Sequence, residues 1–207
     1  MGNMYVTKVN LVLASASPRR RELLSRVGIV FSVIPSNLNE DELVGSASRD
    51  PRAFAEECSR TKADKVAERM PAGKDCWFLG VDTIVVIDGK ILGKPKDRTQ
   101  ARVFLKMLSG RWHKVITGYH LFHPANQKRQ AGLVESEVLI RKISATELEA
   151  YLRTDEPYDK AGAYAAQGVG AGLIEAIKGS YTNVVGLPLA ELIKDMLKLR
   201  LIEPKHE

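Results

Sequence analysis

The chain has 207 residues, of which 44% are hydrophobic and 27% are charged, and these proportions exclude a disordered or fibrous protein. Its length suits one domain that buries most of its apolar surface. The formal net charge of +6 favours an anionic partner, such as nucleic acid, an anionic membrane surface or a phosphorylated small molecule. A soluble surface rich in solvated charges gives the same net charge without any anionic partner.

Signals for export or membrane insertion are incomplete. Cys58 and Cys76 have neither metal-ligand spacing nor the density of a secreted disulfide scaffold. The apolar run Leu11–Ala14 is too short for a signal peptide, and no run approaches the ~18 apolar residues that span a bilayer. We therefore expect a cytoplasmic protein with no membrane partner.

Strands and helices alternate along the chain, with hairpins between some of them. The first predicted elements are a strand at 9–14, a helix at 18–27, a strand at 31–36 and a helix at 51–69. Strands at 77–87 and 90–92, a helix at 99–108 and strands at 114–122 and 132–142 follow. The last are a helix at 144–153, a strand at 173–177 and a helix at 187–199. The pattern predicts an α/β fold with a mixed, central β-sheet flanked by helices.

Two local signals support these boundaries. Ser17 and Pro18 suit the N-cap and the first position of a helix. Asp88 and Gly89, between two apolar runs, are typical of a tight β-hairpin.

Other boundaries rest on composition. Ser144 and Glu147 have the spacing of a capping box, which predicts a helix start. The segment 162–172 is rich in small residues and predicts a loop. We expect the basic C-terminal tail KLRLIEPKHE, residues 198–207, to be disordered and assign it no function.

The stretch SASPRRR, at 15–21, leads from a predicted strand into a helix. Backbone N–H groups and the positive end of the helix dipole favour an anion at such a turn. Arg19, Arg20 and Arg21 oppose that dipole unless an anion offsets them, and guanidinium groups form paired bonds to phosphate oxygens. Solvated arginines, or arginines paired with acids such as Glu22, are the structural alternative. We expect an anion site here, with not all three arginines pointing inward.

Asp82 lies in the middle of an otherwise apolar predicted strand. A buried carboxylate is costly unless it is paired, hydrogen-bonded or bound to metal. Such a group could coordinate a divalent ion, activate a water as general base, or both. A satisfied structural aspartate is the alternative.

Lys94 follows the predicted hairpin in a Gly-Lys-Pro sequence. If the two strands pair, Lys94 is expected near Asp82, as its partner or as a phosphate ligand. Glu40, in a polar loop, and Lys62, inside a long helix, are individually only surface candidates.

Two later stretches, 156–168 and 179–188, contain enough small residues to let the backbone approach a ligand closely. Gln167, in the first of them, can read a base edge with its amide donor and acceptor. Tight packing of helices on the sheet explains the same composition, so spacing alone does not decide between the two.

Several common site motifs are absent from the sequence. The four histidines have no zinc-binding spacing, and no Walker loop, nucleophile elbow or dinucleotide-binding glycine motif occurs in the required context.

Six motifs, in order, give the chain a family resemblance: LASASPRRRELL, VDTIVV, GKPKD, SGRWHKVITG, EPYDKAGAYAAQG and GSYTNVVGLPL. Together they resemble the Maf family of nucleoside-triphosphate pyrophosphatases from about Leu11 to Leu189. The resemblance implies one domain over 1–207, an elongated α/β fold of two lobes with a cleft between them. It implies hydrolysis between the α and β phosphates, with a divalent cation, Mg²⁺ or Mn²⁺, and it suggests a homodimer.

The resemblance also implies residue roles. The family's proposed general base falls on Asp82. The positions tied to substrate choice fall on Arg19, Thr83 and Gln167. The positions that handle phosphate or metal fall on Ser15, Arg20, Glu40, Lys62 and Lys94. Glu40 and Asp82 are thus the expected metal ligands.

The SPRR, AYAAQG and GSYTNVVGLPL motifs look like the dTTP/UTP pyrophosphatase branch, whose action would remove unwanted nucleotides. The 7-methyl-GTP branch usually has another residue after SP, and EG where this chain has Gln167 and Gly168. The amide of Gln167 suits the O4 and N3–H of thymine or uracil.

The chain also departs from the family pattern. Val81 replaces the usual alanine, and Asn37 and Asn39 stand where acids are common, which lowers the local negative charge and leaves Glu40 as the expected ligand there. Arg21 has no family role that we can assign.

The resemblance leaves alternatives of two classes. The same chemistry with 7-methyl-GTP, pseudouridine or 5-methyl triphosphates is the nearer one. A nucleic-acid-binding module is the other, but the basic residues are dispersed and no RNA- or DNA-binding motif occurs, so we expect no nucleic-acid partner.

Overall fold

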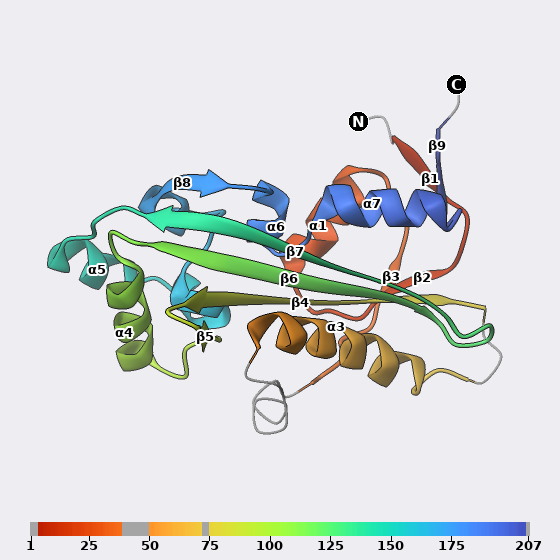
Figure 1. Ribbon diagram of the computed structural model, residues 1–207, viewed down its shortest axis with the longest axis horizontal. Helices are drawn as coiled ribbons and strands as arrows, with labels where there is room; N and C mark the ends of the chain where they lie inside the picture. The colour runs from red at the N-terminus through yellow and green to blue at the C-terminus, as the bar shows by residue number, and fades with distance from the viewer. Residues whose placement is uncertain (1–3, 39–49, 72–74, 206–207) are drawn as a thin grey trace. The chain divides into compact units, whose positions relative to one another are not determined.

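The structure is a computed structural model that describes residues 4–38, 50–71 and 75–205 (Figure 1). Its backbone contacts define two compact units, one drawn from 1–82, 117–133 and 186–207 and the other from 83–116 and 134–185. Three long strands, β4 (Trp77–Ile87), β6 (Trp112–His123) and β7 (Lys128–Ile140), contribute residues to both units.

The first unit contains a mixed α/β arrangement built around a short parallel strand. β2 (Leu11–Leu13) lies between β3 (Ser32–Val33) and β4 and runs parallel to both. All three residues of β2 are buried, which explains their uniformly apolar character. β6 and β7 follow β4 in the strand order.

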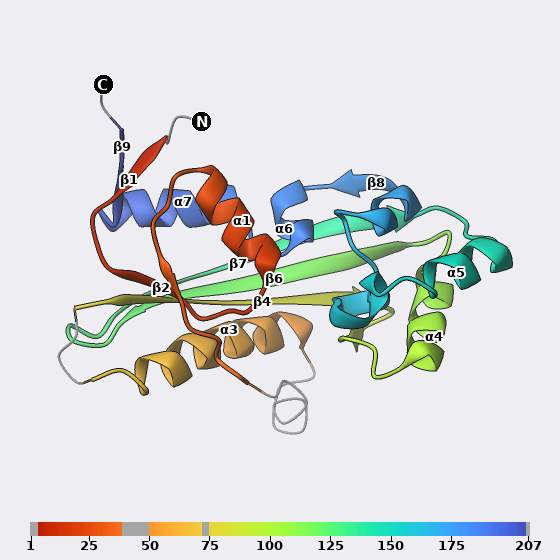
Figure 2. The same ribbon diagram turned by 180° about the vertical axis from the view of Figure 1, so that it is seen from behind.

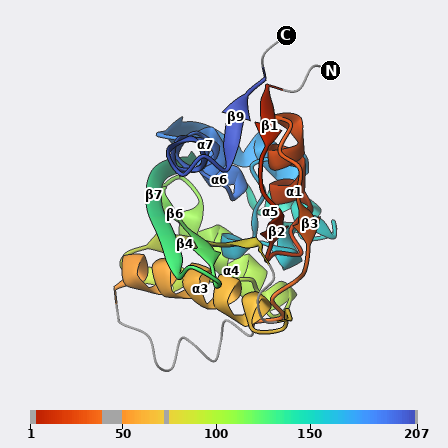
Figure 3. The ribbon, with the colours of Figure 1, turned by 90° about the vertical axis from the view of Figure 1, so that its right-hand side faces the viewer.

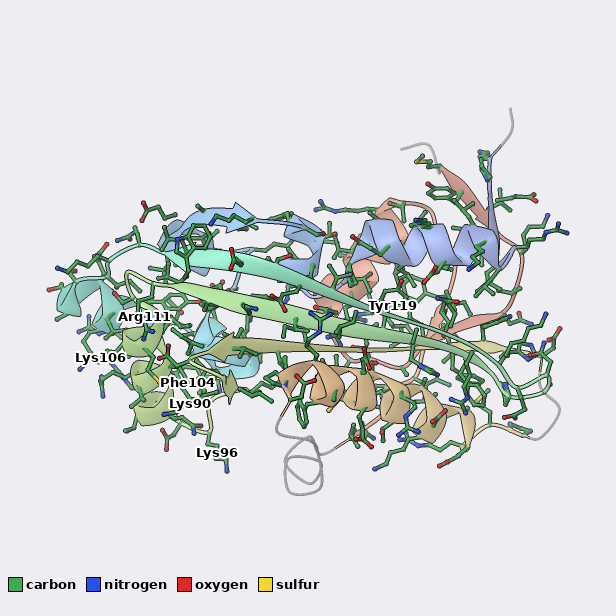
Figure 4. All side chains as sticks on the ribbon, viewed as in Figure 1. Lys90, Lys96, Phe104, Lys106, Arg111 and Tyr119 are labelled. Atoms are coloured by element: carbon green, nitrogen blue, oxygen red, sulfur yellow. The ribbon has the colours of Figure 1, made fainter. Side chains whose placement is uncertain are left out.

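Helices cover both faces of this part of the sheet. α3 (Pro51–Ala67) lies on one face, and α1 (Pro18–Arg26) and α7 (Leu189–Lys198) lie on the other (Figures 1 and 3). Tyr119 of β6, labelled in Figure 4, donates a hydrogen bond of 2.7 Å to Asp195 and so ties α7 to the sheet.

Glycines on two strands let α3 approach the sheet closely. A Cβ atom at Gly118 would lie 2.6 Å from the carbonyl oxygen of Ala55, and one at Gly80 would collide with the carbonyl of Ser59. Neither contact can relax by rotating a side chain, because the helix backbone itself is in the way. Glycine at these positions therefore sets the distance between α3 and the sheet.

The last described strand pairs with the first. β1 (Tyr5–Thr7) and β9 (Ile202–Pro204) form an antiparallel two-stranded sheet, and the Lys8 N–H extends it by donating to the Leu201 carbonyl (Figure 2). The expectation of a disordered tail over 198–207 is therefore wrong for residues 198–205. β1 was not predicted either, because its three residues have no adjacent hairpin signal of the kind that marks β5.

The second unit combines a hairpin, helices and an edge strand. β5 (Lys90–Leu92) is antiparallel to β4, and β8 (Ile174–Lys178) is antiparallel to β7. α4 (Arg98–Leu108) and α5 (Ala145–Tyr151) pack with these strands around an apolar cluster that contains fully buried Leu105, Leu108 and Ile140.

Two local sequence signals in this unit are confirmed by the structure. Asp88 and Gly89 both have positive φ, as the predicted tight hairpin requires. Ser144 and Glu147 form the predicted capping box at the start of α5. These features depend on neighbouring residues alone, so the sequence was sufficient to predict them.

Other boundaries needed correction. The loop predicted at 162–172 is largely 3-10 turns, over Ala161–Ala163 and Val169–Leu173, after another at Glu156–Asp159. A short helix, α6 (Tyr181–Val185), was not predicted. Ser17 occupies the N-cap position of α1, but its side chain makes no capping hydrogen bond.

The close approach of the α3 backbone to Gly118 leads to a prediction about stability. Gly118→Ala should lower the free energy of unfolding by about 2 kcal/mol, because the added methyl group collides with the α3 backbone. Urea denaturation measures the change. Gly172→Ala is the control, since a Cβ there meets no atom within 4 Å. Equal stability of the two variants would contradict this account of the helix position.

The burial of His113 leads to a prediction about how stability depends on pH. Its side chain is buried, its Nε2 lies 2.7 Å from the Tyr164 hydroxyl, and burial lowers its pKa to about 4. Unfolded histidine binds a proton below about pH 6.5, so the unfolded state takes up the proton first as the pH falls and stability falls with it. We expect this residue to account for a loss of about 2 kcal/mol between about pH 7.5 and pH 5.

The non-titrating variant His113→Gln keeps a polar group for Tyr164 and isolates this contribution. Urea denaturation at the two pH values should show a smaller loss in the variant than in the wild type. The same loss in both proteins would mean that His113 is not responsible.

Candidate functional site

The turn from β2 into α1 is organised by Arg20 within the first unit. The Arg20 side chain is buried; its Nε donates to the Gly186 carbonyl at 2.9 Å and its Nη1 donates to the Ser15 hydroxyl at 2.9 Å. The Ser17 N–H also donates to the Ser15 hydroxyl, at 3.3 Å. One guanidinium group thus joins the strand-to-helix turn to the segment before α7.

The three arginines of this turn differ in burial. Arg20 is buried, Arg19 is half-buried and Arg21 is exposed. This agrees with the expectation that they do not all point inward. Glu22, the acid considered as a partner, pairs instead with Arg26 at 2.6 Å.

Asp82 and Lys62 form a buried ion pair, also within the first unit. The Lys62 Nζ donates to Asp82 Oδ1 at 2.5 Å, and the two residues are only 7% and 2% exposed. An isolated charge at this depth would be strongly unfavourable, and a lysine ammonium offsets that cost. The expected surface position of Lys62 is wrong, because this face of α3 is pressed against β4.

The local sequence explains why the two charges meet. Gly80 precedes Asp82 by two residues on the same face of β4, and its missing side chain admits α3 at Ser59 and Ala63. Lys62 lies on α3 beside Ala63 and so reaches the carboxylate. The sequence made Lys94 a candidate partner of Asp82, and the structure pairs Asp82 with Lys62.

The other predicted residues belong to the second unit. Thr83 follows Asp82 on β4 and is half-buried, Lys94 is exposed after β5, and Gln167 is half-buried between two 3-10 turns. The Gly93 carbonyl accepts a hydrogen bond of 3.1 Å from the Gly162 N–H, which links the Lys94 segment to the turn region.

Two pairs of the predicted site residues are in direct contact. Within the first unit, Ser15 contacts Arg20 and Lys62 contacts Asp82. Glu40, the other expected metal ligand, lies outside the described residues. The contact of Gly186 with Arg20 was not predicted; its φ of 121° is a conformation that favours glycine.

A divalent cation needs oxygen ligands, and Asp82 supplies a carboxylate at the required depth. Among residues 4–38, 50–71 and 75–205, no group of three or more histidine, cysteine, aspartate or glutamate side chains could hold a metal ion. Mg²⁺ is commonly held by one or two carboxylates together with substrate phosphates, and this arrangement is compatible with Asp82.

Two further features of the described chain, its helices and a surface hollow, involve none of the predicted site residues in a membrane span or a pocket. None of its helices is both long enough and apolar enough to cross a membrane. A surface hollow of about 510 Å³ lies in the second unit, beside Lys106 of α4 (Figure 4), and none of the predicted site residues lines it.

The mixed α/β fold, the basic strand-to-helix turn and the buried lysine–aspartate pair define a protein suited to phosphorylated ligands. A family model described as Maf-like protein matches residues 10–199. The chain belongs to this family, as the sequence motifs predicted.

Curated relatives agree with this assignment. The chain is 49% identical over 189 residues to a protein of Syntrophotalea carbinolica, covering 91% of this chain and 84% of that one. It is 45% identical over 200 residues to a protein of Syntrophus aciditrophicus, covering 95% of each. A protein of Thermococcus kodakarensis is 49% identical over 179 residues, covering 86% and 91%. All three are named dTTP/UTP pyrophosphatase.

The buried pair of Lys62 and Asp82 leads to a prediction about stability. Lys62→Met should lower the free energy of unfolding by about 3 kcal/mol, because it leaves the Asp82 charge buried without its ammonium. The double variant Lys62→Met/Asp82→Asn should lose less than the sum of the two single variants.

Urea denaturation of the four proteins gives the coupling energy, and Lys65→Met on the same helix is the control. Strict additivity of the two substitutions would show that the pair is not energetically coupled.

Proposed function

We propose that this protein hydrolyses nucleoside triphosphates between the α and β phosphates, releasing a monophosphate and pyrophosphate, and that dTTP and UTP are its preferred substrates. The proposal is carried by the buried Lys62–Asp82 pair, found in a chain that is 49% identical to a relative named dTTP/UTP pyrophosphatase. Removal of unwanted nucleotides from cellular pools would be the biological role.

The basic turn supports the phosphate-binding part of this proposal. Arg19 and the N-terminal amides of α1 bind the triphosphate, since guanidinium groups and a helix N-terminus both favour phosphate oxygens. Arg20 and Ser15 hold the turn in shape through their mutual hydrogen bond. Lys94 is a further phosphate ligand in the proposal.

Asp82 is the proposed general base. Its carboxylate takes a proton from a water molecule that attacks the α phosphorus, and the bond from that phosphorus to the bridging oxygen of the β phosphate breaks. Pyrophosphate leaves with the electron pair. Lys62 fixes the carboxylate in place and balances its charge, so that the base is held in one orientation.

A divalent cation, Mg²⁺ or Mn²⁺, would be held by Asp82 and Glu40, whose carboxylate oxygens are the donor type that such ions prefer. When bound, it would supply positive charge that offsets the charge of the phosphates.

Base choice is assigned to Gln167 and Thr83. The Gln167 amide has both a donor and an acceptor, which match the O4 and N3–H of uracil and thymine. A preference for 7-methyl-GTP or another modified base is the alternative within the same chemistry.

The proposal includes the remaining expectations. A single domain over 1–207, with two lobes and a cleft, a homodimeric state, a cytoplasmic location and the absence of a nucleic-acid partner all stay predictions. The membership of the chain in the Maf-like family supports them.

Pyrophosphate release from dTTP, UTP, CTP, GTP and 7-methyl-GTP, each with Mg²⁺ or Mn²⁺, tests the proposal. We expect the highest kcat/KM with dTTP and UTP. Asp82→Asn should lower kcat by about 1,000-fold, the range expected for loss of a general base. Asp88→Asn, which changes an exposed turn aspartate, should leave the rate near that of the wild type.

The outcomes separate the parts of the proposal. Preference for another nucleotide would retain the chemistry and overturn the role of Gln167. Full activity in Asp82→Asn would remove the general base, and inactivity with every nucleotide would refute the proposed activity.

A further inference from the structure

The carboxylate of Glu156 binds the backbone of the turn that follows Gln167. The Val169 N–H donates to Glu156 Oε2 at 3.0 Å, and the Gly170 N–H donates to Oε1 at 2.7 Å. Each carboxylate oxygen thus receives a backbone amide from a segment 13 or 14 residues further along the chain. Hydrogen bonds to a charged acceptor are stronger than neutral ones, so this contact restrains the turn firmly.

The glycines of the turn fit this carboxylate closely. Gly168 has a φ of 93°, a conformation that favours glycine, and a Cβ atom there would collide with Glu156 Oε2. A Cβ at Gly170 would lie 2.5 Å from the Tyr151 hydroxyl. The backbone is therefore packed directly against the two side chains, with no space for an additional methyl group.

Tyr151 also holds the Glu156 carboxylate. Its hydroxyl donates to Glu156 Oε1 at 2.9 Å, and its ring is buried in the apolar cluster of the second unit. Glu156 is consequently fixed to α5 through Tyr151. Movement of the turn would require breaking hydrogen bonds to both carboxylate oxygens.

Gln167 lies between this contact and a second backbone anchor. On the N-terminal side, the Gly162 N–H donates to the Gly93 carbonyl at 3.1 Å. On the C-terminal side, the amides of Val169 and Gly170 are bound by Glu156. A glutamine that distinguishes bases must present its amide in one orientation, because a rotated amide exchanges donor and acceptor.

We propose that Glu156 is the positioning residue that fixes the turn carrying Gln167 and so determines how well the enzyme discriminates among bases. This inference rests on the proposed function, in which Gln167 contacts the base. Glu156 does not touch the reacting phosphates in this scheme; it acts through the backbone of residues 167–170. Its removal should therefore affect substrate binding and base choice more than the chemical step.

Glu156→Gln tests the inference with a side chain of the same size. One oxygen becomes an NH₂ group, which faces a backbone N–H and cannot accept its hydrogen bond. We expect KM for UTP and dTTP to rise about tenfold, with kcat within about twofold of the wild type, because one charged hydrogen bond is lost. Discrimination against CTP should fall by a similar factor.

Two further variants support the interpretation. Asp155→Asn removes the same charge from the neighbouring exposed residue, whose side chain makes no capping hydrogen bond, and should leave KM unchanged. Tyr151→Phe removes the hydroxyl that donates to the carboxylate and should raise KM about threefold. If Glu156→Gln does not fold, Tyr151→Phe carries the test.

Amide hydrogen exchange gives a readout independent of activity. In Glu156→Gln the amides of Val169 and Gly170 should exchange faster than in the wild type, while the Gly162 amide should keep its wild-type rate. A lower unfolding temperature with unchanged KM and unchanged base discrimination would overturn the inference, since Glu156 would then have only a structural role.

Gln167→Ala separates this inference from the proposed function. If Gln167→Ala relaxes base discrimination and Glu156→Gln does not, the inference about Glu156 is wrong and the proposed role of Gln167 remains. If the wild type hydrolyses dTTP and UTP no better than the other nucleotides, or Gln167→Ala leaves discrimination unchanged, the assignment of base choice to Gln167 is wrong and the inference fails with it.

Discussion

The ion pair between Lys62 and Asp82 is the interaction on which the first unit depends. It places a full positive and a full negative charge at a depth where neither is stable alone, so the two must be buried together. That requirement fixes the rotation and the height of α3 against β4. The glycines at 80 and 118 belong to the same constraint, because a larger residue would hold the helix too far away for the lysine to reach.

Charged side chains also order the loops, and each unit uses the opposite polarity. In the first unit, the Arg20 guanidinium donates to the carbonyl of Gly186. In the second, the Glu156 carboxylate accepts from two amides. Both loops are rich in glycine, whose flexible backbone would otherwise sample many conformations. A buried or anchored charge selects one of these conformations.

Much of the fold could be predicted from the sequence because its signals are local. The apolar run of β4, the hairpin at Asp88 and the capping box at Ser144 each depend on residues near one another. The family motifs gave the expected site residues, whose roles stay predictions. The sequence did not reveal the burial of Lys62, because a single lysine on a long helix is normally a surface residue and only the tertiary contact of α3 with β4 places it inside. The roles of Gly186 and Glu156 in holding loops were missed for the same reason, since their partners are distant in the sequence.

The pairing of β1 with β9 bears on how the chain is made. A ribosome releases Tyr5–Thr7 first, yet the partner strand Ile202–Pro204 emerges only after nearly all the described residues have been synthesised. The helices and the hairpin, whose contacts are short in sequence, can form while translation proceeds. The edge of β1 stays unpaired throughout that time and offers its N–H and C=O groups to any other strand. Its short length, three residues, limits this exposure and so reduces the risk of aggregation of the nascent chain.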